Sequence, residues 1–415
     1  MGTEMTTSAD GWRRSRLRGD DAFLVVADLH NHTLLSDGRG DPERAFAQMR
    51  AAGLDVAALT DHASIPVEQR DELGLDHYPD AAALEVARRM PRSFDEAAWE
   101  RTAELADEFD VPGVFTALRG FEWTEPWLGH VNVWFSDTYQ GVDTPGSLAG
   151  LFAFLAQREQ KALFGYNHPG REGGRHEEFA APAQDDESDA DLTSRMVALE
   201  AFNRGDDYLF GLGGASSALV ACLDAGWRPG LIGCSDEHGR QYGLAGRGRT
   251  GLWVHEHSRS GVREALSARR SFATREIGLR LDATLDGVPM GSAGAVGARA
   301  DLAVDLASAE GAVDGSLFDT LHGREVELQV LVSAAATGGR SPRVDVVAQV
   351  PAVVGEVTRA TIDVPASAPW VVLRVADPTR PYGPAGARER APVGHAADCW
   401  ALAYASPWWR EASTS

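Results

Sequence analysis

The chain has 415 residues, which is longer than one typical domain. Hydrophobic residues make up 44% of it, enough to form a sizeable buried core. Its 61 acidic residues outnumber 39 lysines and arginines, and the formal charge of -22 opposes binding to nucleic acid and to anionic membranes. Three cysteines without zinc-knuckle or disulfide spacing favour a reducing compartment. No segment resembles a signal peptide or a membrane span, so we expect a cytoplasmic protein. We expect its partner to be a small-molecule substrate, and the protein to act alone or as a homo-oligomer.

The first part of the chain alternates short apolar runs with segments of helical period. Residues 1–21 are polar, and we expect them to form a flexible leader. The apolar run 22–30 predicts a strand, and 41–53 predicts a helix with a capping residue before it and a glycine at its end. This alternation continues to residue 276 and is typical of strand–helix repetition. Further strands are predicted at 54–62, 114–123, 162–170, 196–205, 229–238 and 250–256, and further helices at 147–160 and 214–227.

Seven predicted strands with intervening helices indicate an α/β fold with a parallel sheet. The sheet can be closed into a barrel or left open and doubly wound, and spacing alone does not choose between these arrangements. Residues 63–94 and the acidic segment 181–192 are predicted to be long excursions on the surface.

After residue 276 the hydrophobic pattern changes to a period of two, which is typical of antiparallel strands with one exposed face. We therefore place a boundary near residue 277 and expect a β-rich, sandwich-like accessory domain over 277–415. His322 and His395 are isolated there, so we expect this domain to be structural or to shape the mouth of a cavity. The alternating segments are 299–307, 325–333, 343–351, 358–365 and 370–378.

Side chains that commonly bind metals follow the predicted strand ends between residues 22 and 276. Because the carboxyl ends of parallel strands open onto one face, groups far apart in the sequence can meet around one cavity. In the pair His30 and His32, period-two geometry sends both imidazoles to the same side, so one ion can bind both. The candidate ligands are His30, His32, Asp37, His62, Glu122, His130, His168, Asp236 and His238.

Two nearby motifs have simpler interpretations. His255 and His257 repeat the His-x-His spacing, but no loop with a carboxylate follows, so we interpret them as hydrogen-bonded loop residues. Asp61, which precedes His62, is a candidate for orienting a ligand rather than binding an ion itself.

Three residues are candidates for substrate binding. Arg171 and Arg204 follow strand ends and can bind an anionic group, although solvated loop arginines are an equally good interpretation. Trp123 adjoins Glu122 and, with Trp127 and Trp134, can line an aromatic pocket. Aromatic residues at such spacing belong to the core more often than to a pocket.

The order of these motifs resembles the polymerase-and-histidinol-phosphatase (PHP) superfamily of metal-dependent hydrolases. The matching motifs are HNH, Asp37, TDH, GFE, GH, NHP and SDEH, between residues 28 and 275. The resemblance implies a distorted (β/α)7 barrel over 22–276 and a site for two to three divalent ions. It further implies a first ion on His30, His32, Glu122 and Asp236, a second on Glu122, His130 and His168, and a third on Asp37, His62 and His238.

Mixed imidazole and carboxylate ligands without thiolate suit zinc, manganese or iron. Water that bridges two such ions loses a proton near neutral pH, so we expect a hydrolase with Glu122, Asp236 and His238 as catalytic residues. A third ion favours a phosphoryl group, whose oxygens can be shared among the cations, so phosphoester hydrolysis is the predicted activity.

Two alternatives stay open. Segments such as 117–135 and 230–240 are similar to the branch of the superfamily that includes carbaryl (N-methylcarbamate) hydrolases, which implies a carbamate or carboxylic ester as substrate. A noncatalytic binding module with the same fold is the other alternative. The intact ligand set disfavours it, because a decayed site no longer needs these polar groups.

Overall fold

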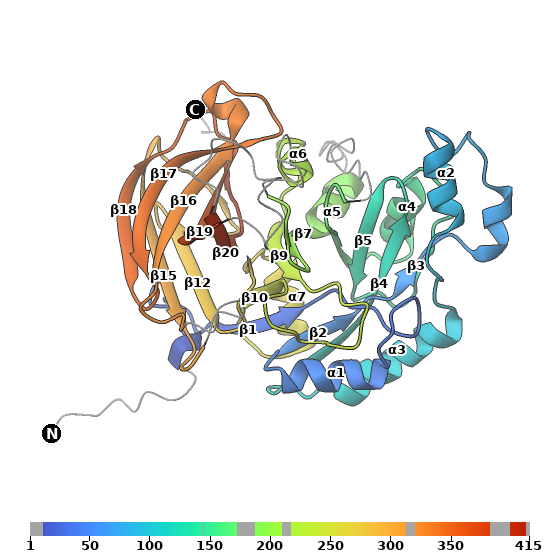
Figure 1. Ribbon diagram of the computed structural model, residues 1–415. Helices are drawn as coiled ribbons and strands as arrows, with labels where there is room; N and C mark the ends of the chain where they lie inside the picture. The colour runs from blue at the N-terminus through green and yellow to red at the C-terminus, as the bar shows by residue number, and fades with distance from the viewer. Residues whose placement is uncertain are drawn as a thin grey trace.

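The computed structural model shows a mixed α/β protein in which strands and helices alternate before residue 271 and strands predominate after it (Figure 1). Within the part of the chain that it describes, no helix is both long and apolar enough to span a membrane. The described residues are 11–143, 145–171, 187–209, 217–312, 320–381 and 399–411.

The first strand–helix–strand unit forms as its sequence predicts. β1 (Phe23–Asp28) and β2 (Val56–Leu59) pair in parallel, and α1 (Pro42–Ala51) connects them. The carboxylate of Asp41 accepts a hydrogen bond from the backbone N–H of Glu43, so it caps the helix where the sequence predicts its start. The apolar face of α1 is buried, as expected for an amphipathic helix against a sheet.

The sheet continues from β2 with a mixture of parallel and antiparallel neighbours. β2 pairs in parallel with β4 (Thr116–Glu125). Parallel pairing also joins β6 (Leu163–Tyr166) to β7 (Met196–Asn203) and β7 to β9 (Gly230–Cys234). Between these two groups lies β5 (Gly129–Trp134), which is antiparallel to both β4 and β6.

The carboxyl end of β9 lies beside the carboxyl end of β1. A parallel bridge between Asn31 and Glu237 joins the chain after β9 to the chain after β1. The backbone N–H of Asp236 donates to the carbonyl of His30 at 3.0 Å, and the N–H of His32 donates to the carbonyl of Glu237 at 3.0 Å. The ends of β1 and β9, which carry predicted ligands, are therefore held side by side.

Two strands are antiparallel to their neighbours, so the prediction of a purely parallel sheet is wrong. β5 forms a hairpin with β4, because residues 126–128 are far too few for a crossover, which needs about a dozen residues. The predicted strand 250–256 corresponds to β10 (Arg249–Val254), which pairs antiparallel with β1.

Helices and short elements complete this part of the chain. The excursion predicted at 63–94 contains the 3-10 helix η2 (Val67–Glu72) and the helix α2 (Ala81–Arg88). The remaining elements are η1 (Gly11–Arg13), β3 (His62–Ala63), α3 (Glu96–Phe109), α4 (Ala149–Gln157), α5 (Glu187–Arg195), β8 (Asp206–Asp207), α6 (Ala218–Asp224), α7 (Arg259–Ser267) and β11 (Ser271–Thr274).

The segments with a period of two after residue 276 are strands, as predicted. One antiparallel sheet contains β12 (Leu279–Leu285), β13 (Val288–Pro289), β15 (Arg299–Ser308) and β18 (Val357–Asp363). Another group of antiparallel strands contains β16 (Glu325–Ser333), β17 (Val344–Val353), β19 (Trp370–Pro381) and β20 (Cys399–Ala405). The smaller elements are β14 (Ala293–Gly294), η4 (Ala334–Thr337) and β21 (Trp408–Arg410).

The β-rich part is continuous with the rest of the protein. Leu281 and Val304 from one sheet and Val330 and Leu373 from the other belong to one buried core, which also contains side chains of β1 and α1. β20 pairs antiparallel with β11, and β11 pairs with β10, so hydrogen-bonded strands cross the boundary predicted near residue 277.

Residues 11–21, which the sequence predicts to be part of a flexible leader, form ion pairs with the rest of the protein. Arg16 Nη2 lies 2.6 Å from Asp305 Oδ1, and Arg18 Nη2 lies 3.0 Å from Asp282 Oδ1. Arg13 also pairs with Asp55 at the start of β2. Basic residues of segment 11–21 thus form ion pairs with buried or half-buried carboxylates in both parts of the protein. The sequence pattern alone does not show these pairs.

Replacing Arg16 by alanine is expected to lower the free energy of unfolding by about 1 kcal/mol near neutral pH, because the arginine is 45% exposed and solvent screens part of the attraction. Burial by itself raises the pKa of Asp305, but Arg16 and Arg280 outweigh burial and hold it below the usual 3.8. The pair therefore stabilises the fold fully above the usual pKa and loses this contribution as the pH falls through the lower pKa of the folded protein.

Urea unfolding of wild type and R16A, at neutral and at acid pH, measures this difference. The gap between the two proteins should shrink at acid pH, and alanine at the exposed Arg50 of α1 serves as the control. An equal gap at both pH values would show that the charge on Asp305 is not involved.

Candidate metal centre

Seven of the nine predicted ligands line one cavity of about 260 Å³. The other two, His30 and His32, are fully buried and contact Glu122 and Asp236. Those that line the cavity directly are Asp37, His62, Glu122, His130, His168, Asp236 and His238.

His30 and His32 follow β1 and face the same centre. Their Nε2 atoms are 3.0 Å apart, and they lie 3.6 Å and 3.4 Å from Asp236 Oδ1 respectively. Period-two geometry places both imidazoles on one side, and the pairing of this segment with the end of β9 brings Asp236 to them. Two imidazole nitrogens that face one carboxylate suit a divalent cation among them.

Glu122 lies at the centre of the histidines. Its Oε1 is 3.1 Å from His30 Nε2, 3.2 Å from His130 Nδ1 and 3.4 Å from His168 Nε2. Its Oε2 is 2.7 Å from His62 Nδ1. Both carboxylate oxygens therefore face imidazoles, and Glu122 is a member of two groups of possible metal ligands.

In the part of the chain that the structure describes, four groups of ligand atoms are close enough to hold an ion. They overlap, since several side chains belong to two groups. The groups are His32, Asp37, His62 and His238; His30, His32 and Asp236; His30, Glu122 and His168; and His62, Glu122 and His130.

This grouping differs from the division that the family resemblance implies. His62, expected on the third ion only, also lies with Glu122 and His130. His130 and His168 fall into different groups, although both contact Glu122. Asp37 and His238 are the more exposed members, so their group faces the outside of the site.

The charges inside the site are strongly coupled. Burial by itself lowers the pKa of His30, but the carboxylates of Glu122, Asp236 and Glu200 raise it well above its usual value. Burial by itself raises the pKa of Glu122, but His130, His30 and His62 outweigh burial, so the pKa lies well below its usual value. Burial, reinforced by the positive charges of His62 and His238, lowers the pKa of His32 well below its usual value.

These residues fit a divalent metal. Ionised carboxylates and neutral imidazoles are the ligand forms of these side chains. His130 Nε2 and His32 Nδ1 are buried polar atoms without a hydrogen-bond partner among the described residues, which is unusual for a folded protein. A cluster of nitrogen and oxygen ligands without thiolate matches zinc, manganese or iron.

A buried carboxylate that the sequence patterns did not single out supports the ligands from behind. Glu200 Oε1 is 2.8 Å from His30 Nδ1, and its Oε2 accepts hydrogen bonds from the backbone N–H of His168 and from Asn203 Nδ2, each at 2.7 Å. Such outer partners fix the orientation of a ligating imidazole. The available signal was a lone glutamate inside the apolar strand β7.

Asp61 organises a loop rather than a ligand. Its Oδ1 accepts hydrogen bonds from the backbone N–H of Thr33 at 2.7 Å and from Ser36 Oγ at 2.6 Å. Its Oδ2 accepts from Thr33 Oγ1 at 2.9 Å. Burial raises the pKa of Asp61 despite these bonds. The loop that it holds leads directly to Asp37.

The two predicted arginines lie in the cavity wall. Arg171 Nη1 is 2.7 Å from Asp236 Oδ2, and Arg204 Nη2 is 3.1 Å from the same oxygen. Arg204 Nη2 also lies 3.1 Å from His238 Nδ1. His168, Arg204 and Asp236 have positive φ angles of 24°, 54° and 48°, and such backbone strain is concentrated at functional sites.

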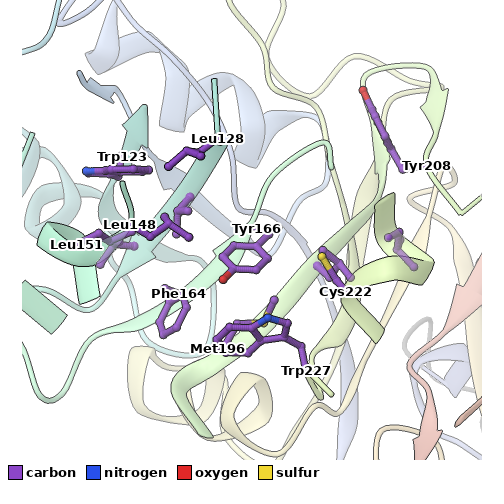
Figure 2. Close-up of a cluster of buried hydrophobic side chains, with 14 of the residues drawn as sticks. Trp123, Leu128, Leu148, Leu151, Phe164, Tyr166, Met196, Tyr208, Cys222 and Trp227 are labelled. Atoms are coloured by element: carbon purple, nitrogen blue, oxygen red, sulfur yellow. The ribbon is translucent and has the colours of Figure 1, made fainter. Parts of the chain in front are cut away.

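The structure corrects the substrate-binding role predicted for Trp123. Because side chains alternate along β4, Glu122 faces the cavity and Trp123 faces the opposite side. Figure 2 shows Trp123 in the hydrophobic cluster that contains Leu128, Leu148 and Leu151. It is 1% exposed, so it stabilises the core and does not line the cavity.

The other aromatic and histidine candidates also lie outside the centre. Trp134 is buried and donates a hydrogen bond to the carbonyl of Leu29 at 3.0 Å. His257 Nε2 lies 3.0 Å from the carbonyl of Asp55, as expected for a loop histidine. His322 is exposed, and His395 lies outside the described residues.

Comparisons with known proteins place little of the chain in a described family. A family model described as a protein of unknown function (DUF3604) matches residues 75–144, which include Glu122 and His130. No curated protein matches the chain.

Several solved structures are similar to the chain at low identity. A two-domain protein containing a predicted PHP-like metal-dependent phosphoesterase, from Bacteroides vulgatus, is 16% identical with a TM-score of 0.45 over 94% of this chain and 96% of that one. PsfC from Pseudomonas syringae is 18% identical with a TM-score of 0.35 over 60% and 90%.

The lesion-specific endonuclease PfuEndoQ from Pyrococcus furiosus is 15% identical with a TM-score of 0.32 over 59% of this chain and 56% of that one. This chain therefore spans about half the length of that enzyme. At identities this low, the chemistry of the site has to be inferred from its own residues.

Proposed function

We propose that this chain is a metal-dependent hydrolase of the PHP type that cleaves small phosphoesters. The observation that carries the proposal is the convergence of nitrogen and oxygen ligands with Arg171 and Arg204 in one cavity. In a chain with a formal charge of -22, two arginines beside the ligands provide local positive charge for an anionic substrate.

The nine predicted ligands are proposed to hold two to three divalent ions of zinc, manganese or iron. Such ions lower the pKa of water and offset the charge that develops on phosphoryl oxygens. Glu122, which lies between the histidines, would offset the charge of two ions. Asp37 and His238 are the ligands nearest to solvent, so their group is proposed to meet the substrate first.

The arginines have a separate role in this proposal. Planar guanidinium groups donate paired hydrogen bonds to phosphoryl oxygens and hold their direction. Asp236 Oδ2 accepts from both arginines, so this carboxylate orients them while its Oδ1 faces His30 and His32. Asp236 therefore links the anion-binding side of the cavity to the metal-binding side.

The arginines favour a phosphoester over a neutral carbamate or carboxylic ester, which needs no anion-binding pair. The narrower resemblance to carbaryl hydrolases rests on sequence segments, and the similar solved structures described above do not support it. A noncatalytic role is disfavoured because a binding module does not need so many buried ligands facing one cavity.

Chelation and metal addition test the proposal. The full chain, loaded separately with zinc, manganese and ferrous iron, is assayed against nitrophenyl phosphate, bis(nitrophenyl) phosphate, naphthyl N-methylcarbamate, nitrophenyl acetate and a DNA duplex. We expect phosphoester hydrolysis that chelation abolishes and metal addition restores, together with a lower melting temperature for the chelated protein.

Each other outcome decides against the proposal. Hydrolysis of the carbamate or acetate alone would favour the alternative substrates. Metal binding without turnover of any substrate would indicate a noncatalytic module. Cleavage of the DNA duplex would contradict the prediction, drawn from net charge, that nucleic acid is not a partner.

A further inference from the structure

Two chemically different sets of residues line the cavity. One set contains predicted metal ligands together with Arg171 and Arg204. The other set is apolar, and we call it the apolar wall. It consists of Val86, Met90, Pro91 and Pro126.

Arg70 holds the backbone of two residues of the apolar wall, Met90 and Pro91, in place. Arg70 Nη1 donates a hydrogen bond to the carbonyl of Met90 at 2.6 Å, and Nη2 donates to the carbonyl of Pro91 at 2.9 Å. Arg70 Nε also donates to the carbonyl of Ile65 at 3.1 Å. One guanidinium group therefore ties both ends of the excursion 63–94 together.

The same segment is attached to the metal-binding side. The backbone N–H of Phe94 donates a hydrogen bond to the carbonyl of His62 at 3.0 Å. Ser64 Oγ, two residues after His62, donates to the carbonyl of Pro91 at 3.0 Å. The distance between the apolar wall and the ligands is thus fixed before any substrate binds, which reduces the entropy cost of binding.

Packing of the fold does not explain an apolar residue at position 86. The face of α2 that packs against the protein contains Ala83, Leu84 and Ala87, all of which are buried. Val86 is 53% exposed and lies on the cavity. An exposed apolar side chain next to a charged site offers surface that a ligand can cover.

We propose that the alcohol part of the substrate is a compact apolar group that packs on the apolar wall; this inference rests on the proposed function. The phosphoryl group of the same molecule would face Arg171 and Arg204. The side chains of the wall carry no N–H or O–H donors, so they favour an alkyl or aryl group over a sugar. The volume of about 260 Å³ is just below the usual range of about 300–1,000 Å³, which indicates a small substrate.

A series of phosphonates tests this inference without turnover. Methylphosphonate, propylphosphonate, butylphosphonate and benzylphosphonate are titrated into the metal-loaded full chain by calorimetry. Because burial of one methylene contributes about 0.8 kcal/mol, we expect affinity to increase about two- to fourfold per methylene. Inorganic phosphate gives the affinity of the charged group alone.

Matched variants locate the effect. Val86→Ser, with Val86→Ala as a second replacement, is expected to reduce the gain per methylene while leaving the affinity for methylphosphonate nearly unchanged. Val67→Ser is the control, because Val67 is 60% exposed in the same excursion and is not among the residues that line the cavity. This control should retain the wild-type series.

The possible outcomes separate this inference from the proposed function. Equal affinity across the series, with methylphosphonate still bound, would overturn the apolar wall and leave phosphoester binding intact. Equal effects of the Val86 and Val67 variants would also overturn it. No binding of phosphate or of any phosphonate would overturn the proposed function and this inference together.

Discussion

A Glu122→Gln protein is expected to lose divalent ions from two positions and nearly all turnover. Glu122 is fully buried, and its two oxygens face five imidazoles, those of His30, His32, His62, His130 and His168. Glutamine keeps the size of the side chain but removes the negative charge that offsets two cations. The histidines then have one fewer anion to balance the ions, so both positions should weaken together.

The size of the effect can be bounded from below. Replacing residues that only support a metal ligand reduces affinity or activity by about 10- to 100-fold, so replacing a bridging ligand should reduce turnover by about 100-fold or more. Mass spectrometry of the metal content and assay of the same samples with nitrophenyl phosphate measure both quantities. His62→Ala should weaken the two groups that contain His62, the outer group with Asp37 and His238 and the group with Glu122 and His130. It should spare the group of His30, Glu122 and His168 that E122Q disrupts.

Glu125→Gln is the matched control for this experiment. Glu125 lies on the same strand β4, is fully buried and accepts hydrogen bonds from the backbone N–H groups of Trp127 and Leu128. It belongs to none of the ligand groups found among the described residues. Full metal occupancy and wild-type rate in E122Q would refute the bridging role.

A Glu200→Gln protein is expected to bind metal about 10- to 100-fold more weakly while it remains folded. Glu200 accepts hydrogen bonds from Asn203 and from the backbone of His168, and it lies 2.8 Å from His30 Nδ1. A carboxylate can accept from all three, whereas the NH2 group of glutamine places a donor against at least one other donor. His30 then loses the partner that fixes its ring, and its Nε2 no longer points steadily at the site.

Competition with a chromophoric chelator measures the metal affinity of E200Q, and thermal unfolding of the chelated protein measures its stability. Glu159→Gln is the control, because Glu159 is also buried, accepts backbone hydrogen bonds from Asp137 and Thr138, and belongs to none of the ligand groups found among the described residues. A purely structural role for Glu200 would lower the stability of both variants and leave the metal affinity of both unchanged.

The sequence alone indicated which side chains the structure brings together at the candidate site, because their positions follow local rules. His30, His62, His168 and Asp236 each come at or just after the end of an apolar run, and the carboxyl ends of neighbouring parallel strands lie at the same edge of a sheet. The period of two after residue 276 predicts strands for the same reason, since it reflects one buried and one exposed face.

Tertiary structure decided the features that depend on which strands are neighbours. The alternation along β4 shows that Glu122 and Trp123 face opposite sides, but only the packing around the strand shows which side holds the cavity. The direction of β5 and the grouping of the ligands also depend on contacts between strands rather than on any single strand.

The contacts that the sequence did not predict join residues that are far apart along the chain. Glu200 and His30 are 170 residues apart, and Arg16 and Asp305 are 289 apart. Along the chain, Glu200 is a lone glutamate in an apolar strand and Arg16 is one cation in a polar segment. Each acquires its partner only when the fold closes, because hydrophobic periodicity reports which face of an element is buried and carries no information about which charged group lies opposite.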